Sequence, residues 1–163
     1  MFDKTGIASR EMVQNLLPSE ERRKKGPYAV FECFQEIPCN PCYTSCNVGA
    51  VKEFEDINNI PQVDSEKCTG CGICVSNCPG LAIFVIDETY SDQEATVKIP
   101  YELLPLPEVD QVVDALDREG KPIGKARVLK VQSAKALNKT NAITIVVPKE
   151  QAMQVRHIGW GEN

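Results

Sequence analysis

The 163-residue sequence has eight cysteines, and all of them lie in two stretches with short spacing. Closely spaced thiols can hold a metal, form a redox-active pair or form disulfides. No apolar run in the sequence is long enough for a secretory signal or a membrane span, so we expect a cytoplasmic protein whose thiols stay reduced. Metal binding is therefore the chemistry that these residues favour. The eight candidates are Cys33, Cys39, Cys42, Cys46, Cys68, Cys71, Cys74 and Cys78.

The two cysteine stretches are copies of one motif. CYTSCNVGAV at 42–51 aligns with CVSNCPGLAI at 74–83 at an offset of 32 residues. At the same offset Cys39 aligns with Cys71. Cys33 is then the counterpart of Cys68, with three additional residues in the loop that follows it. The unusual C-x5-C spacing at the start of the first copy is thus the C-x2-C of the second copy with a lengthened loop.

The second copy, KCTGCGICVSNCPG, has the spacing of the bacterial iron–sulfur run, in which the fourth cysteine ligates the other cluster. A compact iron–sulfur cage requires three thiolates to converge within two tight turns. Gly70 and Gly72 allow the positive φ angles that such turns need, and their N–H groups can point at cluster sulfurs. Pro79 fixes the chain as it leaves the site.

On these motifs, roughly residues 27–92 resemble the bacterial-type ferredoxins that hold two [4Fe–4S] clusters. The resemblance implies two [4Fe–4S] cofactors and a pseudo-symmetric α+β fold with crossed ligands. It implies that one cluster is bound by Cys33, Cys39, Cys42 and Cys78. It implies that the other cluster is bound by Cys68, Cys71, Cys74 and Cys46.

The first copy departs from this family pattern. Asn47 follows its last cysteine where the family usually has proline. Pro41 lacks an N–H group that could donate to a cluster sulfur, which would make the first cluster harder to reduce. If Cys33 is not a ligand, the first site would hold a three-iron cluster or would use water, Glu32 or Glu36 instead.

Zinc and a redox dithiol are the alternatives to an iron–sulfur site. Structural zinc takes four cysteines, usually as two separated C-x2-C pairs, and these two interlocked runs exceed what one or two zinc sites require. A thioredoxin-like dithiol needs a strand–CxxC–helix context, which is missing from the sequence. The cysteine pattern therefore favours iron–sulfur clusters.

Charge is unevenly distributed along the chain. Residues 27–110, which contain every cysteine, carry three basic and 14 acidic side chains and a net charge of −11. The flanking stretches are basic, with net charges of +2 for residues 1–26 and +4 for residues 111–163. An acidic centre repels phosphates, so we expect no nucleic-acid partner.

The fold class that we expect is α+β, with a ferredoxin-like dicluster module followed by a small all-β barrel or sandwich. The predicted domains are an N-terminal helical extension at 1–26, the dicluster module at 27–94 and an all-β docking domain at 95–163. We expect helices near 9–17 and at SEERRKK, the latter solvated, with short helical turns after each C-x3-C. Strands are expected at 28–34, VKEFED, FVIDETY, ATVKIPYE, twice within 111–132, and at AITIVVP and MQVRHIGW.

No catalytic set accompanies the cysteines in the sequence. There is no Ser/His/Asp set, phosphate loop or Rossmann glycine pattern, and a four-cysteine cubane has no open position for substrate. His157 is expected to be an ordinary polar residue on a strand. The prediction is a non-catalytic electron-transfer component.

The whole chain resembles the small iron–sulfur subunits that accompany FAD-dependent dehydrogenases in anaerobes. This resemblance implies a hetero-oligomer with larger redox subunits, including a flavoprotein. The alternatives are a free soluble ferredoxin-type carrier and, from another class, a regulatory or structural iron–sulfur protein.

Overall fold

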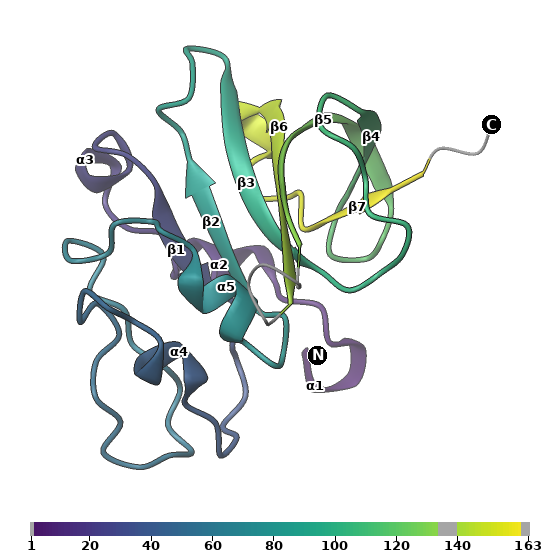
Figure 1. Cartoon of the computed structure of the whole chain (residues 1–163). Coiled ribbons are helices and arrows are strands. Elements are labelled where there is room, and N and C mark those ends of the chain that lie inside the picture. The colour runs from purple at the N-terminus through teal and green to yellow at the C-terminus, as the bar shows by residue number, and fades with distance from the viewer. Residues whose placement is uncertain (1, 134–139, 161–163) are drawn as a thin grey trace.

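A seven-stranded antiparallel sheet dominates the computed structural model, which describes residues 2–133 and 140–160 (Figure 1). The strand order is β1-β2-β3-β6-β5-β4-β7. The strands are β1 (Tyr28–Phe31), β2 (Ile83–Asp87), β3 (Glu94–Tyr101), β4 (Val112–Leu116), β5 (Pro122–Gln132), β6 (Asn141–Pro148) and β7 (His157–Gly159). The helices are short: α1 (Phe2–Thr5), α2 (Arg10–Gln14), α3 (Glu20–Arg23), α4 (Pro41–Thr44), α5 (Ile73–Asn77) and the 3-10 helix η1 (Lys149–Gln151).

Strand β1 lies between two hydrophobic cores. Successive side chains of a strand point to opposite faces of the sheet. Tyr28 and Val30 enter the larger core, which the other strands of the sheet build. Ala29 and Phe31 enter a smaller core on the side of the cysteine loops. Cysteines belong to this core or pack against it. This two-sided burial explains why YAVF is apolar throughout instead of alternating.

The sheet is continuous across residue 94. Strand β2 pairs with β3 through Val85↔Lys98, Ile86↔Val97 and Asp87↔Thr96. The coarse expectation of a sheet-dominated fold with few short helices is confirmed. The predicted domain boundaries after residues 26 and 94 stay a prediction. The hydrogen bonds of a single sheet connect the strands on both sides of residue 94.

Two local expectations were wrong. VKEFED forms no strand but a single bridge between Val51 and Val63, because its charged side chains are exposed and leave no apolar face to bury. The helical turns do not follow the C-x3-C segments. Helices α4 and α5 instead contain the first cysteine of each segment, Cys42 and Cys74. Pro41 occupies the first turn of α4, where its missing N–H costs no helical hydrogen bond.

A buried ion cluster joins the segments next to the two edge strands of the sheet. Glu32, directly after β1, accepts hydrogen bonds from Arg156 Nε at 2.8 Å and from Arg118 Nε at 3.1 Å. The side chains of Arg156 and Glu32 are only 4% and 9% exposed. Arg156 also donates to the carbonyls of Ala152 and Val155 and lies over the Phe84 ring, 4.9 Å from its centroid. Such pairing and hydrogen bonding make a buried charge tolerable.

The ion cluster shifts the pKa values of its members. Burial lowers the pKa of Arg156 to about 10, against the opposing effect of Glu32. Burial alone would raise the pKa of Glu32, but the hydrogen bond from Arg118 and the charges of both arginines hold it below its usual value. Glu32 is therefore ionised in the folded protein at neutral pH.

We expect Glu32→Gln to lower the free energy of unfolding at pH 7 by about 3–5 kcal/mol, because it leaves buried arginine charge without a counter-ion. The folded-state pKa of Glu32 is depressed, so this stability is present above about pH 4.3 and is lost as the pH falls through the lower folded value. Urea unfolding at pH 7 and in acid measures both effects. In the control Glu119→Gln, an exposed pair with Lys121 at 3.0 Å is removed, and the change should stay below about 1 kcal/mol. Equal unfolding midpoints for the two variants would contradict the assignment.

Candidate metal centre

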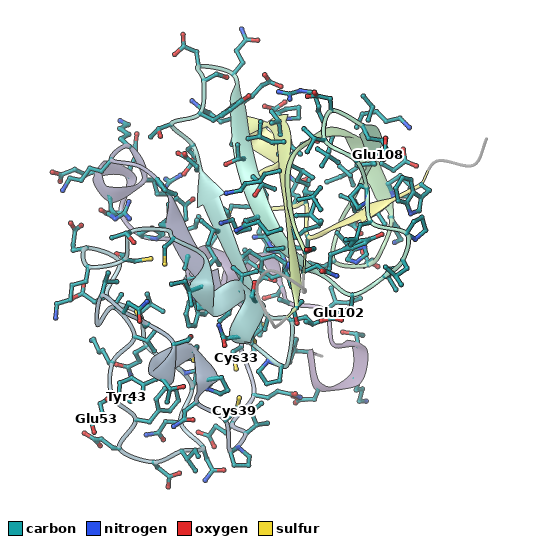
Figure 2. All side chains as sticks on the ribbon, viewed as in Figure 1. Cys33, Cys39, Tyr43, Glu53, Glu102 and Glu108 are labelled. Carbon is teal, nitrogen blue, oxygen red and sulfur yellow. The ribbon has the colours of Figure 1, made fainter. Side chains whose placement is uncertain are left out.

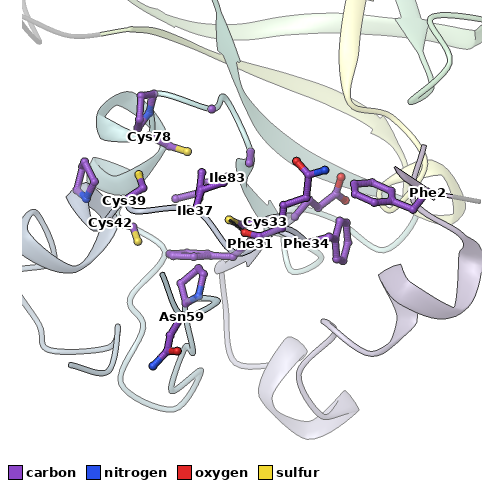
Figure 3. A pocket seen from close by; sticks show the side chains of 17 residues that line it. Phe2, Phe31, Cys33, Phe34, Ile37, Cys39, Cys42, Asn59, Cys78 and Ile83 are labelled. Atoms are coloured by element: carbon purple, nitrogen blue, oxygen red, sulfur yellow. Dashed lines mark hydrogen bonds between the residues drawn. The ribbon is translucent and has the colours of Figure 1, made fainter. Parts of the chain in front are cut away.

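The first group of thiols surrounds a cavity of about 200 Å³. Figure 3 shows Cys39, Cys42 and Cys78 on one side of it and Cys33 on the other, beside Phe31. Cys78 comes from the second motif, at the end of α5. The remaining apolar wall includes Phe2, Phe34, Ile37 and Ile83.

The second group of thiols lines a smaller cavity of about 20 Å³. Its cysteines are Cys46, Cys68, Cys71 and Cys74. A cavity of this volume holds about one water molecule. Cys71 is the exposed member of this group.

The first cysteine loop lies at the opposite end of the molecule from Glu108, whereas Glu102, at the start of the connection between β3 and β4, lies nearer to Cys33. Figure 2 shows Cys33 and Cys39 with Tyr43 and Glu53 at the loop end, far from Glu108. Tyr43 packs edge-on against Phe54 and against the smaller core.

Glycines shape the second motif as the sequence predicts. Gly70 and Gly72 both adopt positive φ angles, 68° and 80°. The N–H of Gly70 donates to Cys68 Sγ at 3.4 Å. A Cβ atom at Gly70 would lie 2.5 Å from Pro27 Cβ and 2.7 Å from its carbonyl carbon, so no larger residue fits this turn. The close approach of the loop to Pro27 therefore requires glycine.

Backbone N–H groups also surround Cys46, which the first motif contributes to the second cavity. The N–H of Ala50 donates to Cys46 Sγ at 3.3 Å. Burial raises the pKa of Cys46, but hydrogen bonds from the N–H groups of residues 48–51 lower it below its usual value. This turn therefore favours a thiolate, the form that binds metal.

The other shifted thiols favour the neutral form in the metal-free protein. Burial, together with neighbouring thiolates, raises the pKa of Cys74 to about 12 and that of Cys42 to about 11. Burial and then the charges of Cys78 and Cys39 raise the pKa of Cys33. Converging thiolates thus need a positively charged group between them, and metal binding must release protons.

The donor sets fit iron–sulfur clusters. Each group supplies four thiols, and N–H donors stand at Cys46 and Cys68. The hydroxyl of Ser45, next to Cys46 in the chain, is buried with no hydrogen-bond partner in the part of the chain that the structure describes. Within that same part, no three His, Cys, Asp or Glu side chains converge closely enough for a single metal ion.

Arg22 is a residue at this site that the sequence did not reveal. It was expected on a solvated helix but is only 6% exposed. Its guanidinium donates to four main-chain carbonyls, including Cys68 O at 2.7 Å and Ser65 O at 2.6 Å. The other two acceptors are the carbonyls of Gly26 and Pro27. The charge of Arg22 therefore holds the loop that leads into the second motif.

The two carboxylates considered as alternative ligands differ in position. Glu32 lines the first cavity, but its carboxylate is engaged by Arg118 and Arg156. Glu36 lines a separate hollow with Glu53 and Glu55. His157 lies on β7, where its ring stacks on Tyr101 with centroids 5.4 Å apart.

Comparison with known proteins gives one family and several relatives. Residues 61–84 match the family model described as "4Fe-4S binding domain", so the second motif belongs to an iron–sulfur binding segment. The chain is 38% identical over 52 residues to the pyruvate synthase subunit PorD of Methanocaldococcus jannaschii, covering 32% of this chain and 58% of that protein. It is 46% identical over 39 residues to the thiosulfate reductase electron transfer subunit PhsB of Salmonella typhi, covering 24% and 19% of the two chains.

A further relative is the ferredoxin-type protein NapF of Escherichia coli, 36% identical over 52 residues, which are 31% of this chain and 32% of that one. The chain thus spans between about a fifth and three fifths of the lengths of these relatives. No solved structure matches the chain significantly. Among residues 2–133 and 140–160, no helix has the length and apolar character to cross a membrane.

We expect Gly70→Ala to destabilise the iron-loaded protein by about 2–5 kcal/mol and to reduce its iron content. The left-handed backbone costs about 1–2 kcal/mol for alanine, and the collision with Pro27 adds about 1–3 kcal/mol. The matched control is Gly120→Ala, where φ is +77° but no atom lies within 4 Å of the new Cβ. It should show the backbone cost alone and full iron content. Urea unfolding and iron analysis measure both, and equal effects of the two variants would refute the steric argument.

Proposed function

We propose that this chain is an electron-transfer subunit that carries two [4Fe–4S] clusters. It relays single electrons between a flavin- or metal-containing catalytic subunit and another redox centre of a multi-subunit oxidoreductase. The observation that carries the proposal is the grouping of eight thiols into two sets of four, each with three members from one motif and one from the other. The "4Fe-4S binding domain" match at 61–84 supports it.

The proposed ligand sets follow the two cavities. Cys33, Cys39, Cys42 and Cys78 hold the first cluster, and Cys46, Cys68, Cys71 and Cys74 hold the second. The position of Cys33 in the wall of the cavity that Cys39, Cys42 and Cys78 also line supports Cys33 as a ligand despite its lengthened loop. The engagement of Glu32 by two arginines argues against carboxylate replacement at this position.

The eight cysteine thiolates would hold two [4Fe–4S] clusters, which would supply one-electron transfer without making or breaking a substrate bond. The electron lost by a reduced flavin or metal centre of the partner would be the one gained by the next redox centre. The chain's own groups hold the thiolates, limit water and supply N–H donors. Gly70 and Ala50 are the donors that the structure describes at cysteine sulfurs.

Partner binding is the second part of the proposal. We place the chain in a cytoplasmic hetero-oligomer whose larger subunits include a flavoprotein. These subunits would bind to residues 95–163 and would carry out the substrate chemistry. Large apolar side chains that remain exposed in this region support a docking role: Leu103 (56%), Leu104 (83%), Val109 (55%), Val112 (64%) and Trp160 (44%). The similarity to PorD, a pyruvate synthase subunit, and to PhsB, a thiosulfate reductase electron transfer subunit, supports the same interpretation.

A free ferredoxin-type carrier remains the second candidate, supported by the net charge of −11 over residues 27–110, which suits transient docking to cationic surfaces. Native size separates the two functions. A subunit co-elutes with larger chains when purified from its source, whereas a free carrier elutes alone near 18.0 kDa.

Anaerobically prepared protein should contain about eight iron and eight acid-labile sulfide atoms per chain, as two four-iron clusters require. Cys71→Ser should lose at least half of this iron, and Cys33→Ser should convert or empty the first site. Thr69→Ser, in the same loop, is the control and should keep all of it. Elemental analysis and EPR of the reduced protein measure these contents. The proposal would be refuted by colourless protein that contains only zinc, or by a Cys71→Ser variant that keeps the full iron content per chain.

A further inference from the structure

Lys98 reaches the second cysteine group from the centre of the sheet. It lies on β3, opposite Val85 of β2 and Thr144 of β6. Because side chains alternate along a strand, Lys98 points away from the larger core that holds Val97 and Ile99. Helix α5, which carries the second motif, contacts β2, β3 and β6 on the sheet. The register of β3 thus directs one lysine toward the cysteine loops.

The ammonium group of Lys98 lies against the turn that carries Cys71. Its Nζ donates to Cys71 O at 3.3 Å. A Cβ atom at Gly72 would lie 2.8 Å from Nζ and 2.8 Å from Cδ, so the side chain packs directly on this glycine. Lys98 and Cys71 also line one cavity of about 130 Å³, whose other walls are Gly72, Ile73, Ser76, Asn77 and Gln132. Lys98 is half-buried, so water screens its charge only in part.

Other charges near this site differ in position or in exposure. Arg22 donates to Cys68 O from the opposite end of the motif. Lys130 interacts electrostatically with Lys98 but is exposed on β5. Asp64 and Glu66 precede Cys68 on the outer loop. Arg22 and Lys98 therefore both contact the backbone carbonyl of a cysteine, Arg22 at Cys68 and Lys98 at Cys71, and Lys98 is the one that also lines a cavity together with its cysteine.

We propose that Lys98 raises the reduction potential of the second cluster, an inference that rests on the proposed function. A cluster becomes more negative by one charge when it gains an electron, and a fixed, poorly screened cation nearby favours that reduced form. The electron comes from the partner's reduced centre, or from dithionite in a titration, and no proton or bond is exchanged with Lys98. Lys98 therefore acts on the electron affinity of the site and is not a ligand.

The test is an EPR-monitored redox titration of the iron-loaded full chain. In Lys98→Gln, the ratio of reduced to oxidised second cluster at a fixed ambient potential should fall about tenfold, which is about 59 mV for a one-electron couple. One of the two titration steps should move while the other stays. Lys98→Arg keeps the charge and should stay within about twofold of the natural chain. Lys130→Gln removes the same charge from an exposed position and should change the ratio less than about twofold.

A second variant keeps the test valid if Lys98→Gln fails to assemble its cluster. Gln132→Lys adds a cation to the wall of the same cavity and should increase the reduced-to-oxidised ratio of the same step several-fold. The inference is overturned if the potential of this titration step does not change when the charge at position 98 or 132 changes. It is also overturned if both titration steps shift equally. Natural protein without iron would overturn the proposed function itself, so the two failures are distinguishable.

Discussion

The crossing of one cysteine between the two motifs is the constraint on which the rest of this structure depends. Cys78 joins the three thiols of the first motif, and Cys46 joins the three of the second. This exchange requires α4 and α5 to pack together, so neither motif can form its cavity alone. Converging thiolates repel one another, and burial raises the pKa of Cys42 and Cys74. Iron would replace their protons and couple cofactor binding to folding.

Two buried arginines connect the cysteine loops to the ends of the chain. Arg22, from the N-terminal segment, holds the carbonyl of Cys68, and Arg156, from the C-terminal segment, holds Glu32 beside Cys33. Each arginine has lost its water and depends on these acceptors. The segments that flank the cysteine motifs therefore do more than present a surface to a partner. Their arginines hold the chain segments that lead into each thiol group, and both groups pack against the same continuous sheet.

The sequence predicts the parts of this structure that depend on local spacing. The offset of 32 residues shows that the two cysteine motifs are copies, and Gly70 and Gly72 have the positive φ angles that their turn needs. Most strands lie where β-forming residues cluster between turns. What the sequence does not reveal depends on contacts between distant residues. SEERRKK is predicted as a solvated helix because the sequence does not show the carbonyl groups that accept hydrogen bonds from Arg22. One of these acceptors lies 46 residues away in the sequence.

The surroundings of the two thiol groups differ although their motifs are duplicates. The first has Pro41 at its helix start, a lengthened loop and a wall that includes Phe2 and Phe34. The second has a glycine N–H at Cys68 and a lysine from β3 against its turn. The two motifs share the C-x2-C-x3-C spacing of their last three cysteines, whereas the charge and polarity around the cysteines differ. The rest of the chain therefore determines how the two sites differ.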